Sequence, residues 1–85
     1  MKKKRKSSVL VAIDGSEYSE KAFEYACKLT INTETSLLIA NIVEEHATIG
    51  YSILKELKKS SNELLIKYET RAESLGVRSV ASIQL

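Results

Sequence analysis

The sequence predicts an α/β domain with a parallel sheet and the element order β-α-β-α-β. Three observations lead to this prediction. Short apolar runs at residues 9–13 and 36–43 are typical of strands buried on both faces of a parallel sheet. Amphipathic stretches with helical spacing follow each run, and a third apolar segment occupies residues 77–85. Strands that alternate with helices in this way favour parallel pairing with right-handed crossovers.

The first helix is expected to begin near Ser16 and to reach about Thr30. Ser16 is a suitable N-cap, and Glu17 lies in the first turn, where the helix dipole favours an acid. Asp14 and Glu17 also have capping-box spacing, so the pattern leaves the first residue of the helix open. The residues expected on its buried face are Ala22, Phe23, Ala26, Leu29 and Thr30.

The second helix is expected over residues 52–75. Gly76 follows it, where a helix C′ position needs a positive φ. Its predicted buried stripe consists of Leu54, Leu57, Ser61, Leu64, Leu65, Tyr68, Ala72 and Leu75.

Length and composition exclude several classes of protein. The 85 residues allow one small domain, and no apolar run approaches the ~20 residues that span a bilayer. One cysteine, Cys27, closes no intramolecular disulfide, and with one histidine, His46, it makes no typical structural zinc site. We therefore expect a cytoplasmic protein that does not insert in a membrane, with no metal site.

The charge is concentrated at the start of the chain. Five of the thirteen basic residues precede residue 7, which leaves eight cations and eleven acids in the remainder. The apolar run at 9–13 is shorter than the ~7–15 residues of a signal-peptide core. Residues 1–7 are thus predicted to be a solvated basic tail, and residues 8–85 the folded domain. The alternative is weak, salt-sensitive nucleic-acid binding, without base stacking, through Lys2, Lys3, Lys4, Arg5 and Lys6.

The ordered set of motifs resembles the universal stress protein family. The first run and its turn read VLVAIDGSEYS, and the apolar positions Ala22, Phe23, Ala26 and Leu29 follow. The second strand with its two acids, the long helix, the Gly76-Val77 exit and the third strand also follow the family's layout. The resemblance implies a Rossmann-like fold with five parallel strands and, usually, a homodimer. Residues 8–85 would be a truncated domain that lacks the fourth and fifth strands.

The resemblance also implies a site for an adenine nucleotide, because some members bind ATP. Asp14 would then lie near the ribose, with Ala12 and Ile13 at the same strand end, and Ile42 would offer its backbone to the adenine. The family's phosphate motif, Gly-x-x-Gly with nine further residues and then Gly-Ser or Gly-Thr, follows the fourth strand and is absent from this sequence. We therefore expect an incomplete ATP site.

Each of these residues also has a structural explanation. Asp14 could cap the following helix, and Ile42 could be an ordinary strand residue. No base is placed to activate Ser16, Ser19 or Cys27, so no catalytic residue is assigned.

The favoured hypothesis is therefore a non-enzymatic stress-response binding module that pairs with itself or with another chain of the family. The alternative is an N-terminal fragment of a nucleotide-hydrolysing or nucleotide-activating α/β enzyme. The related hydrolases have Ser-Gly-Gly-x-Asp-Ser after the first strand, which residues 12–16, AIDGS, do not match.

Overall fold

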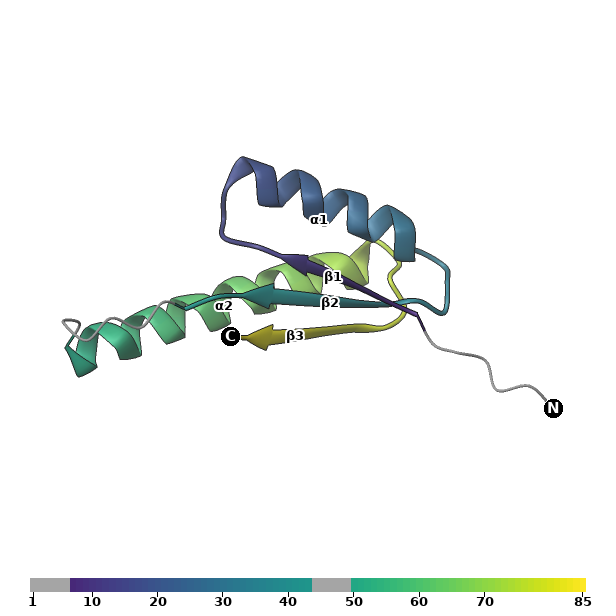
Figure 1. The fold of residues 1–85 in the computed structure, drawn as a ribbon. Helices are drawn as coiled ribbons and strands as arrows, with labels where there is room; N and C mark the ends of the chain where they lie inside the picture. The colour runs from purple at the N-terminus through teal and green to yellow at the C-terminus, as the bar shows by residue number, and fades with distance from the viewer. Residues whose placement is uncertain (1–6, 44–49) are drawn as a thin grey trace.

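The computed structural model describes residues 7–43 and 50–85. Its elements follow the predicted order (Figure 1): β1 (Ser8–Ala12), α1 (Glu17–Thr30), β2 (Ser36–Asn41), α2 (Tyr51–Ser74) and β3 (Val80–Gln84). The basic cluster at residues 2–6 and the loop that holds His46 lie outside the described residues.

The strands form one parallel sheet, as predicted, and they lie side by side in the order β1-β2-β3. Leu37 of β2 aligns with Val9 of β1 and with Val80 of β3. The first and third strands are therefore the edges of the described sheet, and β2 is its centre. An isolated antiparallel bridge between Ile31 and Val77 joins the segments that follow the C-termini of α1 and α2.

Both helices pack on the same face of the sheet. The rings of Phe23 in α1 and Tyr68 in α2 meet edge to face, with centroids 4.7 Å apart. On β3, the Ser82 hydroxyl donates to the Glu69 carboxylate, and the Gln84 side chain donates to the Lys58 carbonyl. Both acceptors belong to α2, so the side chains of Ser82 and Gln84 point toward that helix. The core between sheet and helices contains Val11, Ile13, Phe23, Ala26, Cys27, Leu37, Ile39, Leu65, Tyr68, Ala72 and Val77.

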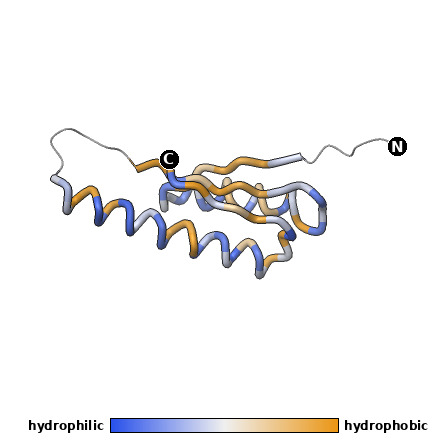
Figure 2. The backbone as a smooth tube through the Cα atoms, turned by 90° about the horizontal axis from the view of Figure 1, so that it is seen from below, coloured by the Kyte–Doolittle hydropathy of each residue, from blue (hydrophilic) through white to orange (hydrophobic). Residues whose placement is uncertain are grey.

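The prediction that the strands are buried on both faces was wrong for β1. Val11 is 6% exposed against the helices, whereas Leu10, its neighbour on the opposite face, is 64% exposed. Successive strand side chains point to opposite faces of a sheet. The described helices cover only one of these faces. In Figure 2 the strand residues are coloured mainly as hydrophobic, so apolar residues lie on the uncovered face as well.

The helix ends match the predicted signals closely. The Ser16 hydroxyl accepts a hydrogen bond from the Ser19 N–H, so Ser16 is the N-cap of α1. Gly76 has φ +102°, the left-handed conformation predicted for the end of α2.

The predicted buried faces of the helices need correction. Leu29 is 49% exposed, because the buried face of α1 is centred on Phe23, Cys27 and Thr30. Leu57 and Leu75, near the two ends of the α2 stripe, are also exposed. Neither of the described helices is both long and apolar enough to cross a membrane.

Candidate functional site

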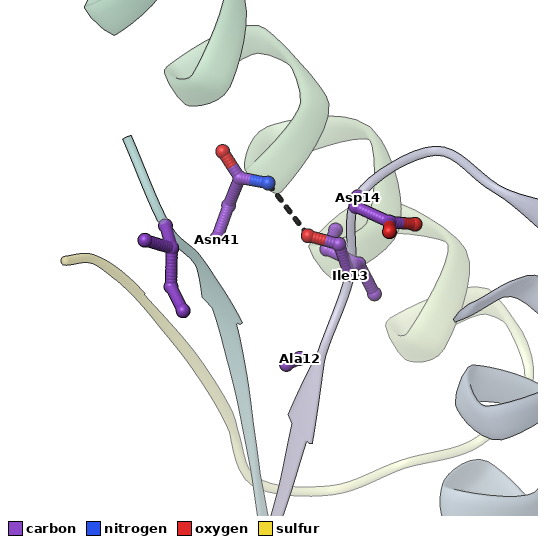
Figure 3. Close-up of a pocket in the computed structure, with 5 residues that line it drawn as sticks. Ala12, Ile13, Asp14 and Asn41 are labelled. Carbon is purple, nitrogen blue, oxygen red and sulfur yellow. Dashed lines mark hydrogen bonds between the residues drawn. The ribbon is translucent and has the colours of Figure 1, made fainter. Parts of the chain in front are cut away.

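A pocket of about 270 Å³ lies at the carboxyl ends of β1 and β2 (Figure 3). Ligands of open α/β sheets bind at this edge, because the strand ends and the following turns meet there. Its lining residues are Ala12, Ile13, Asp14, Asn41 and Ile42. The structure thus brings together the four residues selected from the sequence and adds Asn41.

Asn41 ties the two strand ends together. Its Nδ2 donates to the Ile13 carbonyl over 2.6 Å, while the Ile13 N–H donates to the Ala40 carbonyl over 2.8 Å. The side-chain bond extends the pairing of β1 with β2 beyond the last ladder position. Sequence reasoning treated Asn41 only as part of the apolar run. A polar residue at the carboxyl end of that run was the signal that could have identified it.

Asp14 is held by the turn that begins α1. Its Oδ1 accepts from the Ser16 N–H at 2.8 Å, and its own N–H donates to the Ser19 hydroxyl at 3.3 Å. Hydrogen bonds from Ser16 and then from Ser19 hold the pKa of Asp14 below its ordinary value. Gly15, at φ +82°, gives the turn its left-handed residue. The prediction that Asp14 accepts a turn N–H is confirmed, whereas the N-cap of the helix is Ser16.

The Asp14 carboxyl is directed away from Asn41 in Figure 3. It is exposed at the side of the pocket nearest α1, where it can accept a hydrogen bond from a ligand hydroxyl. The Ser16 N–H already binds Oδ1 of Asp14. This bond fixes the orientation of the whole carboxylate before any ligand binds.

Ile42 places backbone groups over the pocket. The Asn41 carbonyl and the Val43 N–H are bonded to Leu85, at 2.9 and 2.8 Å, on the β3 side. Successive residues of a strand direct their backbone groups to opposite neighbours, so the Ile42 N–H and C=O point toward β1. The last ladder pair of β1 and β2 is Ala12 with Ala40, so the Ile42 backbone groups lie beyond the paired part of the two strands. A donor and an acceptor are thus available to the edge of a flat polar ring.

The electrostatics of the site do not favour phosphate. A helix N-terminus attracts anions, but the first turn of α1 carries Glu17 and Glu20, and Asp14 precedes it. The pocket lining includes no lysine or arginine among the residues described. Gly15 precedes α1, Gly50 precedes α2 and Gly76 follows α2. The described glycines are therefore dispersed and form no phosphate-binding loop. The arrangement suits an uncharged ring with hydroxyl groups better than a polyanion.

Other candidate residues lie away from this pocket. Cys27 is buried in the core, and burial raises the pKa of its thiol, which disfavours the reactive thiolate. In ranges 7–43 and 50–85, no three His, Cys, Asp or Glu side chains come together as a metal site would require. Ser16 and Ser19 are occupied in the capping turn.

Comparisons with known proteins extend this description. The family model described as the universal stress protein family matches residues 7–83. A putative universal stress protein of Staphylococcus saprophyticus is 28% identical over 78 residues, which cover 86% of this chain and 47% of the relative. The chain spans about half the length of the curated relatives that it matches.

Solved structures agree on the fold. A protein of the universal stress protein family from Burkholderia pseudomallei superposes with a TM-score of 0.71 at 22% identity, over 93% of this chain and 63% of that one. A universal stress protein solved in complex with cAMP gives a TM-score of 0.67 at 21% identity, over 93% and 60%. The parallel β-α-β-α-β sheet, its capping turn and the match to the family model over nearly every residue lead to one conclusion: this chain belongs to the universal stress protein family.

Proposed function

We propose that this chain is a non-enzymatic binding module of the stress response, whose pocket takes the nucleoside end of an adenine nucleotide. The observation that carries the proposal is the unpaired backbone edge at Ile42, which lines the same pocket as the oriented carboxylate of Asp14. Adenine offers one donor and one acceptor to such an edge, and ribose hydroxyls can donate to a carboxylate. The pocket volume of about 270 Å³ suits a nucleoside-sized group rather than a whole triphosphate.

The phosphates are the part of ATP that this site does not hold. Asp14 and Glu17 repel them, and the glycine motif that holds them in ATP-binding members is absent from the sequence. We propose that micromolar ATP binding requires a segment with that motif to complete the sheet. A ligand with less negative charge is more compatible with the pocket, and one structural neighbour was solved with cAMP.

The proposal includes no catalysis and a cytoplasmic location. The carboxylate in the pocket has a lowered pKa and is already bonded to a turn N–H, so it is a poor general base at neutral pH. Cys27 is free and buried away from the pocket, and free thiols are typical of proteins in a reducing compartment.

The test is a titration of the isotopically labelled chain followed by amide NMR. Adenosine, cAMP and ATP are compared at equal ionic strength. We expect millimolar adenosine to shift the amides of Ala12, Ile13 and Ile42, with affinity falling from adenosine to cAMP to ATP. Saturable micromolar binding of ATP would overturn the assignment of an incomplete site.

Two controls sharpen this experiment. Guanosine reverses the donor and acceptor at the ring edge, so it should bind at least about tenfold more weakly than adenosine. Asp14→Asn keeps an oxygen for the Ser16 N–H while it removes the charge. This variant should weaken adenosine binding and narrow the difference between adenosine and ATP. Equal shifts with adenosine and guanosine would contradict the role of the Ile42 backbone.

A further inference from the structure

The exposed side of α1 repeats every seven residues. The first seven residues of the helix read EYSEKAF, and the next seven read EYACKLT. Glutamate, tyrosine and lysine recur at the same three positions, and an apolar residue recurs at a fourth. The residues of this repeat are all exposed: Glu17, Tyr18, Lys21, Ala22, Glu24, Tyr25, Lys28 and Leu29. The rest of the helix is buried or half-buried, so the seven-residue period belongs to the side that the described elements leave uncovered.

The apolar members of the repeat form one stripe along the helix. They are Tyr18, Ala22, Tyr25 and Leu29, and we call them the α1 stripe. Their spacing of four, three and four residues is that of a coiled-coil seam, which stays on one side of a helix. Tyr18 and Tyr25 are 87% and 65% exposed, and Leu29 is 49% exposed. Ala22 is exposed too, so its predicted place on the buried face was wrong.

The α1 stripe lies on the side of α1 away from α2. The contacts of α1 with α2 come from Phe23, which meets Tyr68, and from Glu20 and Glu24, which bind Arg71. At 3.6 residues per turn, the centre of the stripe is about 180° around the helix from these side chains. α1 is an outermost element of the fold in Figure 1, so a second helix can approach the stripe along its whole length.

Two lysines border the α1 stripe on its open side. Lys21 and Lys28 lie next to the stripe around the helix, whereas Glu17 and Glu24 lie further from it. In the part of the chain that the structure describes, neither lysine side chain takes part in an ion pair or a hydrogen bond. The residues on the opposite border of the stripe are buried. A helix that packs on the stripe therefore meets two unpaired positive charges on one flank.

We propose that the α1 stripe is the docking site for an amphipathic α-helix of another protein, one with an apolar heptad seam and an acidic flank. The seven-residue period favours a helix as the occupant, because packing of seam residues over successive turns requires this spacing. Lys21 and Lys28 favour an acidic flank, since opposite charges beside a seam attract the partner and like charges oppose it. Pairs of glutamate and lysine four residues apart also stabilise a lone helix, but they leave the two exposed tyrosines unexplained.

The length of the α1 stripe limits the affinity of this complex. Tyr18 and Leu29 are eleven positions apart, which is roughly 16 Å at ~1.5 Å per residue. A buried tyrosine contributes roughly 150–250 Å² of surface, so two tyrosines with two smaller side chains bury less than the ~800 Å² per partner of a standard interface. We therefore expect a reversible complex, with a dissociation constant in the micromolar range.

The test is a titration of the isotopically labelled 85-residue chain with two synthetic peptides of three heptads each. Both peptides have leucine at the two seam positions of every heptad. The acidic peptide has glutamate at the positions that flank the seam, and the basic peptide has lysine there. In amide NMR, the acidic peptide should shift the resonances of residues 17–30 and bind at least about tenfold more tightly than the basic peptide. Its affinity should fall as salt is added.

Charge reversal on α1 provides the sharpest variant. Lys21→Glu combined with Lys28→Glu changes two exposed side chains and should reverse the preference, so that the basic peptide binds more tightly. The matched control is Lys55→Glu combined with Lys59→Glu, which reverses two exposed lysines of α2 and should leave the preference unchanged. If the reversed variant lost the helical circular dichroism of the native chain, glutamine at both α1 positions would replace it. That variant should remove the difference between the two peptides.

A second pair of variants tests the α1 stripe itself. Tyr25→Ser removes an exposed ring from its centre and should weaken binding of the acidic peptide at least about tenfold. Ile66→Ser removes an exposed apolar side chain from α2 and should leave this affinity unchanged.

The same titration contains the results that contradict the proposal. Absence of binding by the acidic peptide would overturn it, and so would equal affinities for the acidic and basic peptides. Shifts of residues 17–30 that depend on the concentration of the chain alone would show that a second copy occupies the stripe, which also overturns it. Shifts confined to Ala12, Ile13 and Ile42 would place the peptide at the pocket instead. None of these results bears on adenosine binding, which is measured separately.

Discussion

The Tyr68 hydroxyl donates a hydrogen bond to the Glu20 carboxylate over 2.5 Å, and this contact joins α2 to α1 above the core. The Arg71 guanidinium binds the same carboxylate, reaches Glu24 at 3.2 Å and lies 5.4 Å from the centroid of the Phe23 ring. The hydrogen bond from Tyr68, and then that from Arg71, hold the pKa of Glu20 below its ordinary value. The two helices are thus connected by an ionised carboxylate.

The stability of the fold should therefore depend on acid pH through Glu20. A carboxyl group with a lowered folded-state pKa stabilises the fold fully above its unfolded value, here 4.5, and loses this contribution as pH falls through the folded value. Glu20→Gln should lower the melting temperature at pH 7, and its difference from the wild type should shrink below pH 4.5. Circular dichroism melts across the acid range measure this difference.

Glu63 supplies the control for this experiment, because it is an exposed residue of α2. Glu63→Gln should leave both the melting temperature and its pH dependence close to those of the wild type. A constant difference between wild type and Glu20→Gln from pH 7 to strong acid would show that the ionised carboxylate is not the stabilising form.

Phe23 and Leu29 should respond very differently to truncation. Phe23 is fully buried between the sheet and α2, so Phe23→Ala should cost about 3–5 kcal/mol, enough to unfold much of a small domain. Leu29 is half exposed, so Leu29→Ala should change the free energy of unfolding by about 0.5 kcal/mol or less. Urea unfolding measures both changes. Equal costs would place Leu29 in the core, contrary to the structure.

The sequence predicted the elements and their parallel direction, because both depend on local periodicity and on helical connections between strands. The predicted strand at residues 36–43 ends at Asn41 in the structure, and the strand predicted from residue 77 begins at Val80. The last difference has a physical cause: Val77 follows the left-handed Gly76 and forms a bridge with Ile31 instead of joining the sheet.

Burial was predicted less well, because it depends on which layers are present. The run at residues 9–13 has the composition of a strand covered on both faces, yet Leu10 and Ala12 are exposed. The pocket residues Asp14 and Ile42 were identified through family resemblance, whereas Asn41 was missed. The sequence marks Asn41 as a polar residue in an apolar run, but its partner, Ile13, is 28 positions earlier, so the contact itself could not be predicted from local pattern.

The basic tail should be dispensable for folding. Residues 2–6 contain no apolar side chain, and their mutual repulsion disfavours packing against the domain. Deletion of these five residues should leave the melting temperature nearly unchanged while it lowers the affinity for polyanions such as heparin or duplex DNA. Thermal melts and a salt series of filter-binding assays measure the two effects. A large fall in melting temperature would show that the tail packs on the domain.

Asn41 should support both the strand ends and the pocket. Asn41→Ala removes the donor of a part-buried hydrogen bond to the Ile13 carbonyl, so it should cost about 1 kcal/mol of stability, measured by urea unfolding. The variant should also reduce the adenosine-induced shifts at Ala12 and Ile42, because the two strand ends are no longer held at one spacing. The matched control is Asn62→Ala, which changes an exposed residue of α2 and should alter neither measurement. If Asn41→Ala lost stability but kept the full adenosine response, Asn41 would stabilise the sheet without shaping the pocket.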